Sequence, residues 1–416
     1  MLTHKNNILK TSLVFLLMAA SAIPLFKQQF ATYLLLFGAL LTLKHIRIGL
    51  DAILFLLLAF ALEMYHNFYF DNYDMVATRQ VMILFASALL IIYYVRLDLL
   101  PIYINILYYF SLISFVFFAL WYADSGLIDS LVKAVPGIFI KTSVNYGSEA
   151  NQVNPIIYNF DSNFTELGRN NGPFWEPTAF AIMLILGQIF NLFLTQKLFN
   201  KKGIVFTIAI FTTLSTTGIL AYFLFVLAYY LFSPKLRKGV KLFIVTAILT
   251  VSVGLYTTLP FLSEKILNEV EKADYEMDKY GGDSRLASAM MDMKEISEDP
   301  VYILFGKGLD NNYRIAGPDK EVLRNCGDTS LLISWGAIFS LAYLCLLFYT
   351  FREMTKFFQV HRGYALVFTL IFLILGFSEV FLTLPFFYAF LFLGFIIKKQ
   401  YIVKETVSAH NELAIN

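Results

Sequence analysis

The sequence predicts an all-α, polytopic integral membrane protein, and three observations support that prediction. Apolar residues make up 58% of the chain and charged residues only 15%, whereas ordinary soluble domains carry roughly 25% charged residues. The apolar residues fall into runs close to the length that a membrane helix needs, about 17 to 25 residues. Lys and Arg are also distributed unevenly between the connections, which is typical of a chain with a fixed orientation in a membrane.

The apolar runs predict about twelve membrane helices in three groups, separated by two long polar loops. Residues 1–122 form an N-terminal five-helix region, 123–172 the first loop, 173–259 the central helices, 260–326 the second loop and 327–397 the C-terminal helices. Residues 398–416 are expected to form a short tail. The predicted helices lie at about 10–26, 30–43, 48–66, 75–95, 99–122, 175–195, 203–216, 218–233, 241–259, 329–350, 363–378 and 380–397.

Positive charge marks one side of this predicted bundle. If both termini are cytoplasmic, the short outer connections keep only Lys27 and Arg79. The cytoplasmic segments then hold Lys5, Lys10, Lys44, Arg47, Arg96, Lys197, Lys201, Lys202, Lys235, Arg237, Lys238, Lys241, Arg352, Lys356, Arg362, Lys398, Lys399 and Lys404. Because cytoplasmic segments of membrane proteins are enriched in Lys and Arg, both long loops are expected outside the cytoplasm.

The first loop ends in the run Arg169-Asn-Asn-Gly-Pro-Phe-Trp-Glu-Pro177. Pro177 suits the first position of a helix, so we expect the next helix to start at Glu176, with the carboxylate facing the positive end of the helix dipole. A phosphate head group would be attracted to the same place. In the simpler interpretation, Arg169 snorkels at the membrane border, Trp175 is an interface anchor and Glu176 is a cap.

The second loop contains one predicted amphipathic helix. Asp283 or Ser284 can cap its start, and Arg285 falls in its first turn. Apolar residues at helical spacing would face the membrane, and acidic residues would face elsewhere, until Asp299-Pro300 ends the helix. The apolar positions are Leu286, Met290 and Met293, and the polar positions are Asp292, Lys294, Glu295 and Glu298. Such a helix is expected to lie on the membrane surface.

Any anion site in the loops must be built from a few arginines. Residues 260–326 hold fourteen Asp or Glu and nine Lys or Arg, so the second loop is no general anion trap. Arg169, Arg285, Arg314 and Arg324 are the candidates, because a planar guanidinium can bind phosphate oxygens bidentately. The alternative for each is a surface ion pair with a nearby acid.

Five short motifs together carry a resemblance to a known family. They are RNNGPFWEPTAFA from Arg169, LSTTG from Leu214, SRLASA from Ser284, PVYILFGKGL from Pro300 and GDTSLLISWG from Gly327. In this order and sidedness they resemble the Wzy-type O-antigen and capsule polymerases and the related O-antigen ligases. The resemblance covers about residues 165–345, each motif alone being of low specificity.

The resemblance implies an enzyme of the bacterial cytoplasmic (inner) membrane that acts on glycan carried by undecaprenyl diphosphate. It implies transfer on the outer face, without cofactor or metal, and with donor and acceptor diphosphates held by Arg169 and Arg285; Arg314 is a further candidate. A chain-length regulator and a flippase are implied as possible partners, and no nucleic acid is. Ligases of the family carry a histidine near the start of the helix after the second loop, where this chain has Gly327-Asp-Thr, and that departure favours a polymerase.

The chemistry needs a carboxylate beside the arginines. The diphosphate is already a good leaving group, so the protein must stabilise the charge developing on it and orient the attacking sugar hydroxyl. Asp328 is our first candidate for accepting the hydroxyl proton and Glu176 the second. Each has a structural alternative as a helix cap. Asn170, Asn171, Trp175 and Thr329 are expected to support the site.

Three other functions fit the same architecture. An O-antigen ligase would transfer glycan to a lipid A core. A multi-span transferase that uses polyprenyl-phosphate sugars would need an acidic pair in the first outer connection, where this chain has Lys27-Gln-Gln29; Glu63, Asp71 and Asp74 come one connection later, and we expect them to form a hydrated helix end. A flippase would show internal repeats, charged residues at mid-membrane depth and short connecting loops, whereas this chain shows no repeat, few buried charges and two long loops on one side.

Overall fold

The computed structural model is almost entirely helical. It describes residues 2–27, 29–70, 75–124, 126, 130, 134, 140–142, 152–154, 156–161, 168–234, 236–258, 270–273, 284–309 and 325–415. The long helices are α1 (Leu2–Ala22), α2 (Gln29–Thr42), α3 (Leu50–Tyr69), α4 (Met75–Val95), α5 (Leu99–Ala123), α7 (Pro177–Thr195), α8 (Lys201–Thr212), α9 (Thr216–Phe232), α10 (Lys238–Thr258), α14 (Gly327–Phe357), α15 (Gly363–Ser378) and α16 (Pro385–Ile415). The shorter elements are η1 (Pro24–Lys27), η2 (Leu43–His45), η3 (Arg96–Asp98), α12 (Arg285–Ile296), α13 (Pro300–Phe305), β1 (Ile140–Thr142), β2 (Gln152–Asn154) and β3 (Phe160–Asp161).

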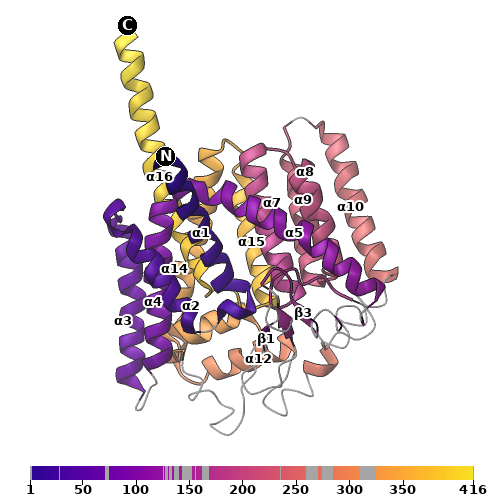
Figure 1. Ribbon diagram of the computed structural model, residues 1–416, viewed down its shortest axis with the longest axis horizontal. Coiled ribbons are helices and arrows are strands. Elements are labelled where there is room, and N and C mark those ends of the chain that lie inside the picture. Colours follow the sequence, from indigo (N-terminus) through magenta and orange to yellow (C-terminus); the bar gives the residue numbers. More distant parts are fainter. Residues whose placement is uncertain are drawn as a thin grey trace.

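The long helices form one bundle with α7 inside it. Every residue of α7 from Pro177 to Phe193 is buried, as expected for a helix that is apolar on all sides. Helices α5, α8, α9 and α15 pack around α7, whereas α10 lies at the edge of the bundle against α9. The ribbon in Figure 1 shows both termini at the upper face and α12 with the strands at the lower face, which we call the loop face.

The membrane prediction is confirmed in its coarse form. Each of the twelve predicted helices coincides with a helix of the described chain. Four segments of that chain are long and apolar enough to cross a membrane: Leu50–Tyr69, Arg79–Ala123, Pro177–Thr195 and Gly327–Phe357. Shorter apolar helices lie at Asn7–Ala22, Phe30–His45, Thr216–Phe232 and Gly363–Ser378. The number of membrane crossings stays a prediction.

Two parts of the chain differ from expectation. The described part of the first loop contains a small antiparallel sheet in the order β1-β2-β3, with Ile140 opposite Asn154 and Val153 opposite Phe160. The predicted tail is not a separate element. Helix α16 continues through it to Ile415 and projects beyond the upper face of the bundle. Residues 398–415 contain no Gly or Pro and several strong helix formers, which explains the continuation.

Helix α12 exists as predicted, but its acidic face is turned toward the protein. Ser284 caps the helix, and its hydroxyl accepts a hydrogen bond from Ala287 N–H. Asp292 and Glu295 are buried where α12 packs on α14, whereas Met293 is 50% exposed. Asp292 and Glu295 thus lie on a different face from Met290 and Met293, as expected, and that face is turned to the protein, where both carboxylates have partners.

Helix α14 is broken in the middle. Gly336 has φ 72° and ψ 173° inside the helix, a conformation that favours glycine. The turn that follows α13, residues 305–308, packs into this break: a Cβ on Gly306 would lie 2.6 Å from both Gly336 N and Ser334 O. We call this segment the 305–308 turn. The sequence predicted an uninterrupted helix here.

We expect Gly336→Ala to lower thermal stability by about 2 kcal/mol or more, because the substitution adds left-handed strain and a clash of Cβ with the Leu304 carbonyl. Gly239→Ala in α10 is the matched control, since nothing lies within 4 Å of a Cβ there. Thermal unfolding of both variants in detergent measures the difference. Equal stabilities would contradict the tight packing of the break.

Candidate functional site

The Arg169–Pro177 run forms a turn that is braced from several helices. The Asn170 amide donates to Ser114 Oγ of α5 and to Thr212 Oγ1 of α8, at 3.0 Å in both cases. The Asn170 Oδ1 atom accepts from Gly172 N–H at 3.0 Å. Gly172 has φ 54°, and a Cβ there would lie 2.9 Å from the Phe180 ring. Asn170 therefore supports the turn from within.

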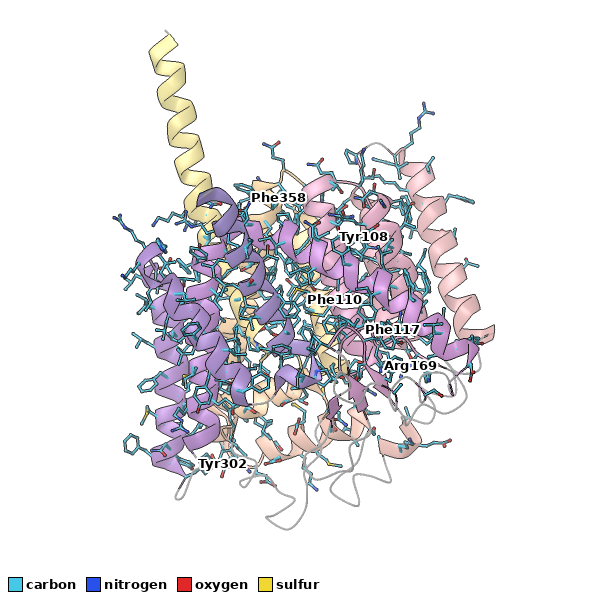
Figure 2. The ribbon with its side chains drawn as sticks, in the orientation of Figure 1. Tyr108, Phe110, Phe117, Arg169, Tyr302 and Phe358 are labelled. Atoms are coloured by element: carbon cyan, nitrogen blue, oxygen red, sulfur yellow. The ribbon has the colours of Figure 1, made fainter. Side chains whose placement is uncertain are left out.

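Arg169 is attached to the junction between α8 and α9. Its Nε–H donates to the carbonyl oxygen of Thr213 at 3.1 Å. Ser215 caps α9 by accepting from Gly218 N–H, and its hydroxyl lies 3.3 Å from the Thr178 hydroxyl in the first turn of α7. This junction is the predicted meeting point of two short helices at 215–218. It places the Arg169 side chain beside the start of the central helix, and Figure 2 shows Arg169 toward the loop face.

The end of the same turn reaches the end of α15. Trp175 is buried, and its indole Nε1–H donates to Glu379 Oε1 at 3.2 Å. Glu379 directly follows α15 and is half-buried. Sequence reasoning missed Glu379, because its position after an apolar helix is that of an ordinary helix end. Only the contact with a tryptophan about 200 residues away identifies it.

Glu176 is the N-cap residue of α7 by backbone conformation, with Pro177 at the first helical position, as predicted. Its carboxylate makes no capping hydrogen bond to the helix. The cap interpretation of this side chain is therefore not supported, and Glu176 keeps its place as a half-buried acid at the positive end of the central helix.

Arg285 reaches the same end of α15 from the second loop. Its Nε–H donates to the carbonyl oxygen of Ser378, the last residue of α15, at 2.6 Å. A helix end leaves carbonyl oxygens without intrahelical donors and carries the negative end of the dipole, so a guanidinium is well placed there. The two predicted arginines thus contact two helix junctions, one at the α8–α9 turn and one at the end of α15.

Asp328 is placed against α15 by two glycines. A Cβ on Gly376 would collide with Asp328 Oδ1, and a Cβ on Gly327 would collide with the Glu379 carbonyl. The N-cap of α14 is Cys326, so the interpretation of Asp328 as the cap is wrong. Asp328 Oδ1 is buried and has no hydrogen-bond partner among the described residues. Next to it, Thr329 Oγ1 donates to Asp292 Oδ2 of α12 at 2.7 Å.

The remaining site candidates are placed less directly. Asn171 is buried in the turn, where its carbonyl oxygen accepts from Phe174 N–H at 3.1 Å. Arg314 and Arg324 lie outside the described residues. Within the described parts of the chain, no group of three or more His, Cys, Asp or Glu side chains could hold a metal ion.

The Cys326 thiol lies beside this site and is buried. Burial raises the pKa of the Cys326 thiol, with the nearby Asp328 carboxylate acting in the same direction. The other cysteine, Cys345, is also free and is exposed on α14. We interpret Cys326 as a packing group because it is buried; the raised pKa agrees with this, since the reactive form of cysteine is the thiolate.

No protein-family model, no curated protein and no solved structure matches this chain. Four of the predicted residues, Trp175, Arg285, Asp328 and Thr329, lie at or next to the end of α15. Trp175 comes from the end of the first loop, Arg285 from the second loop, and Asp328 and Thr329 from the first turn of α14.

We expect the Trp175–Glu379 hydrogen bond to appear as a coupling of about 1.5–3 kcal/mol in a double-mutant cycle of Trp175→Phe and Glu379→Leu, because each substitution removes the bond and hydrogen bonds to charged groups contribute roughly that much. Unfolding of the four proteins in denaturant measures it. Trp335→Phe is the matched control, since the Trp335 indole N–H is buried without a partner among the described residues. If Trp335→Phe showed an equally large coupling to the Glu379 substitution, the assignment of the hydrogen bond to Trp175 and Glu379 would be contradicted.

We expect the Cys326 thiol in a Cys345→Ala background to react with maleimide on the order of ten-fold or more slowly in the folded protein than after denaturation. Because the pKa is raised, the thiolate is scarce at pH 7, and labelling should rise at a higher pH than for an ordinary thiol. Mass spectrometry of timed samples measures the rate. Equal rates before and after denaturation would show that the site is open at Cys326.

Proposed function

We propose that the chain is a Wzy-type polysaccharide polymerase that joins undecaprenyl-diphosphate-linked oligosaccharide units on the outer face of the bacterial cytoplasmic membrane. The observation that carries the proposal is the convergence of Trp175, Arg285 and Asp328 on one helix end. An aromatic ring, a guanidinium and a half-buried carboxylate at a membrane helix end suit a lipid-linked, charged sugar substrate. The order of the motifs in the chain supports the same family.

In the proposed reaction, a sugar hydroxyl of the acceptor attacks the anomeric carbon of the donor glycan. A glycosidic C–O bond forms, the bond from that carbon to the diphosphate oxygen breaks, and undecaprenyl diphosphate leaves with the electron pair. Arg285 and Arg169 would stabilise the negative charge on the two diphosphates. Each guanidinium is oriented by its Nε–H bond to a backbone carbonyl, which reduces the freedom lost on binding phosphate oxygens.

The hydroxyl proton would move to a carboxylate. We assign this role to Asp328, because its side chain is half-buried and no described group donates to its Oδ1 atom, whereas Asp292 accepts from Thr329 and Glu379 accepts from Trp175. A general base needs an oxygen available within hydrogen-bond reach of the proton. Glu176 is the second candidate, and Thr329 supports the site through Asp292.

The nearest alternative is an O-antigen ligase, and the position of His66 does not support it. His66 does approach the second loop, with Nε2 at 2.8 Å from the Phe305 carbonyl oxygen. Its side chain is fully buried, however, so it lies beyond the reach of a substrate in this state. A polymerase stays the proposal, with a chain-length regulator and a flippase as possible partners.

We expect Arg285→Ala and Arg169→Ala each to reduce long-chain glycan by roughly 10- to 100-fold, since a lost charge-assisted hydrogen bond costs about 1.5–3 kcal/mol. The measurement is a gel of lipid-linked glycan from a deletion strain complemented with each variant at equal protein amount. Arg362→Ala, an exposed arginine on the opposite side of the bundle, is the matched control and should give wild-type ladders.

Three outcomes would decide against the polymerase. Wild-type ladders in both arginine variants would remove the proposed mechanism. Single lipid-linked units that accumulate on the inner face of the membrane in the deletion strain would indicate a flippase, and long lipid-linked chains that fail to reach a lipid A core would indicate a ligase.

A further inference from the structure

The 305–308 turn supplies hydrogen bonds that the break in α14 removes. Lys307 N–H donates to the Ile333 carbonyl at 2.7 Å, and Gly308 N–H donates to the Ser334 carbonyl at 3.0 Å. In an unbroken helix, these carbonyls would accept from residues four positions further along. Inside an apolar bundle such groups need a partner within the protein, and here the partner is a segment of the second loop.

The side chain of Lys307 joins the turn to α12. Its Nζ lies 2.8 Å from Glu295 Oε1, and both side chains are buried. The ammonium also lies 5.0 Å from the centre of the Tyr302 ring. A buried ion pair is weakly stabilising at best, because desolvation of both charges opposes their attraction, but it penalises any arrangement that separates the charges. The pair is therefore suited to fixing the position of α12 relative to the turn.

Helix α3 joins the turn from the other side. The Phe305 carbonyl can only accept a hydrogen bond, so His66 donates through Nε2–H at 2.8 Å. The opposite ring nitrogen, Nδ1, lies 3.6 Å from Glu63 Oε1, and both side chains are fully buried. The expectation that Glu63 belongs to a hydrated helix end is wrong, because the carboxylate faces His66 inside the bundle; Asp71 and Asp74 lie outside the described residues.

Helix α12 is then held at successive points along its buried face. Arg285 Nε–H bonds to Ser378 O, Ser288 Oγ accepts from Asn325 N–H at 3.2 Å, Asp292 accepts from Thr329, and Glu295 pairs with Lys307. The last of these contacts is the one farthest from Arg285 in sequence. A shift at Glu295 would therefore be transmitted along a rigid helix to Arg285.

We propose that His66 and Lys307 are positioning residues for the reaction. They hold the 305–308 turn in the break of α14, so that the first half of α14, with Asp328 and Thr329, keeps its register with α12 and Arg285. The catalytic part of this inference rests on the proposed polymerase activity. The positional part does not, because it concerns distances within the folded chain.

The test combines a distance with a rate in the full chain. Spin labels at Met293 of α12 and Leu341 of α14, which are 50% and 62% exposed, report the distance between the two helices in nanodiscs, in a Cys345→Ala background. The main variant is Lys307→Met with Glu295→Met, which removes both charges and leaves neither buried alone. His66→Phe removes the donor to Phe305, and His45→Phe, an exposed histidine, is its control.

We expect the double methionine variant and His66→Phe to fold, to broaden the distance distribution and to lower turnover by roughly 10- to 100-fold at little changed KM, as for misplaced catalytic groups. Lys307→Arg keeps the positive charge and should therefore keep the wild-type distance and the wild-type turnover. Turnover is measured with lipid-linked oligosaccharide extracted from the deletion strain.

A wild-type distance in the double variant would overturn the positioning role, and so would a broadened distance with wild-type turnover. A broadened distance in the double variant, together with wild-type glycan ladders in both Arg285→Ala and Arg169→Ala, would leave the positional part standing and overturn the polymerase proposal instead.

Discussion

The carbonyl end of α15 is the point on which the loop face depends. Ser378 ends that helix with an oxygen that no residue of α15 can satisfy, and Arg285 satisfies it from the second loop. The negative end of the helix dipole favours a positive charge at this place. Because Gly327 and Gly376 lack a Cβ, α14 can begin close against the same helix end. The second loop, through the bond from Arg285 to the Ser378 carbonyl, and the start of α14 therefore meet at the same end of α15.

The same constraint acts a second time at the break in α14. An interruption inside the bundle exposes carbonyl groups that water cannot reach, and the 305–308 turn satisfies them. Both sites therefore bind loop residues to membrane helices through backbone oxygens. This arrangement explains why the acidic face of α12 is buried: the helix is positioned by its ends, and its carboxylates meet Thr329 and Lys307 from there.

Hydropathy was sufficient to place the helices, since membrane helices need long apolar runs and little else. Local chemistry was sufficient for the cap at Ser284 and for the start of α7 at Glu176-Pro177, because both depend on neighbours in sequence. The sequence could not predict the roles of Glu379 and His66. Each depends on a partner in another part of the chain, Trp175 in one case and Phe305 in the other. The break at Gly336 was missed because the glycine alone does not distinguish a kink from close packing.

The carboxylates of α12, of the start of α14 and of the end of α15 differ in the donors that they already have. Glu295 is paired with Lys307, Asp292 accepts from Thr329, and Glu379 accepts from Trp175. In these three, at least one oxygen is engaged in holding the structure together, and losing that role would cost stability. Asp328 differs, because it is held in place by close packing on Gly376 and its Oδ1 atom accepts from no described group. Gly376 and Ser378 are two residues apart, so Asp328 and Arg285 meet the same turn of α15. The proposed proton acceptor and the proposed phosphate-binding cation thus lie within one helical turn, as the proposed transfer of a sugar from a diphosphate requires.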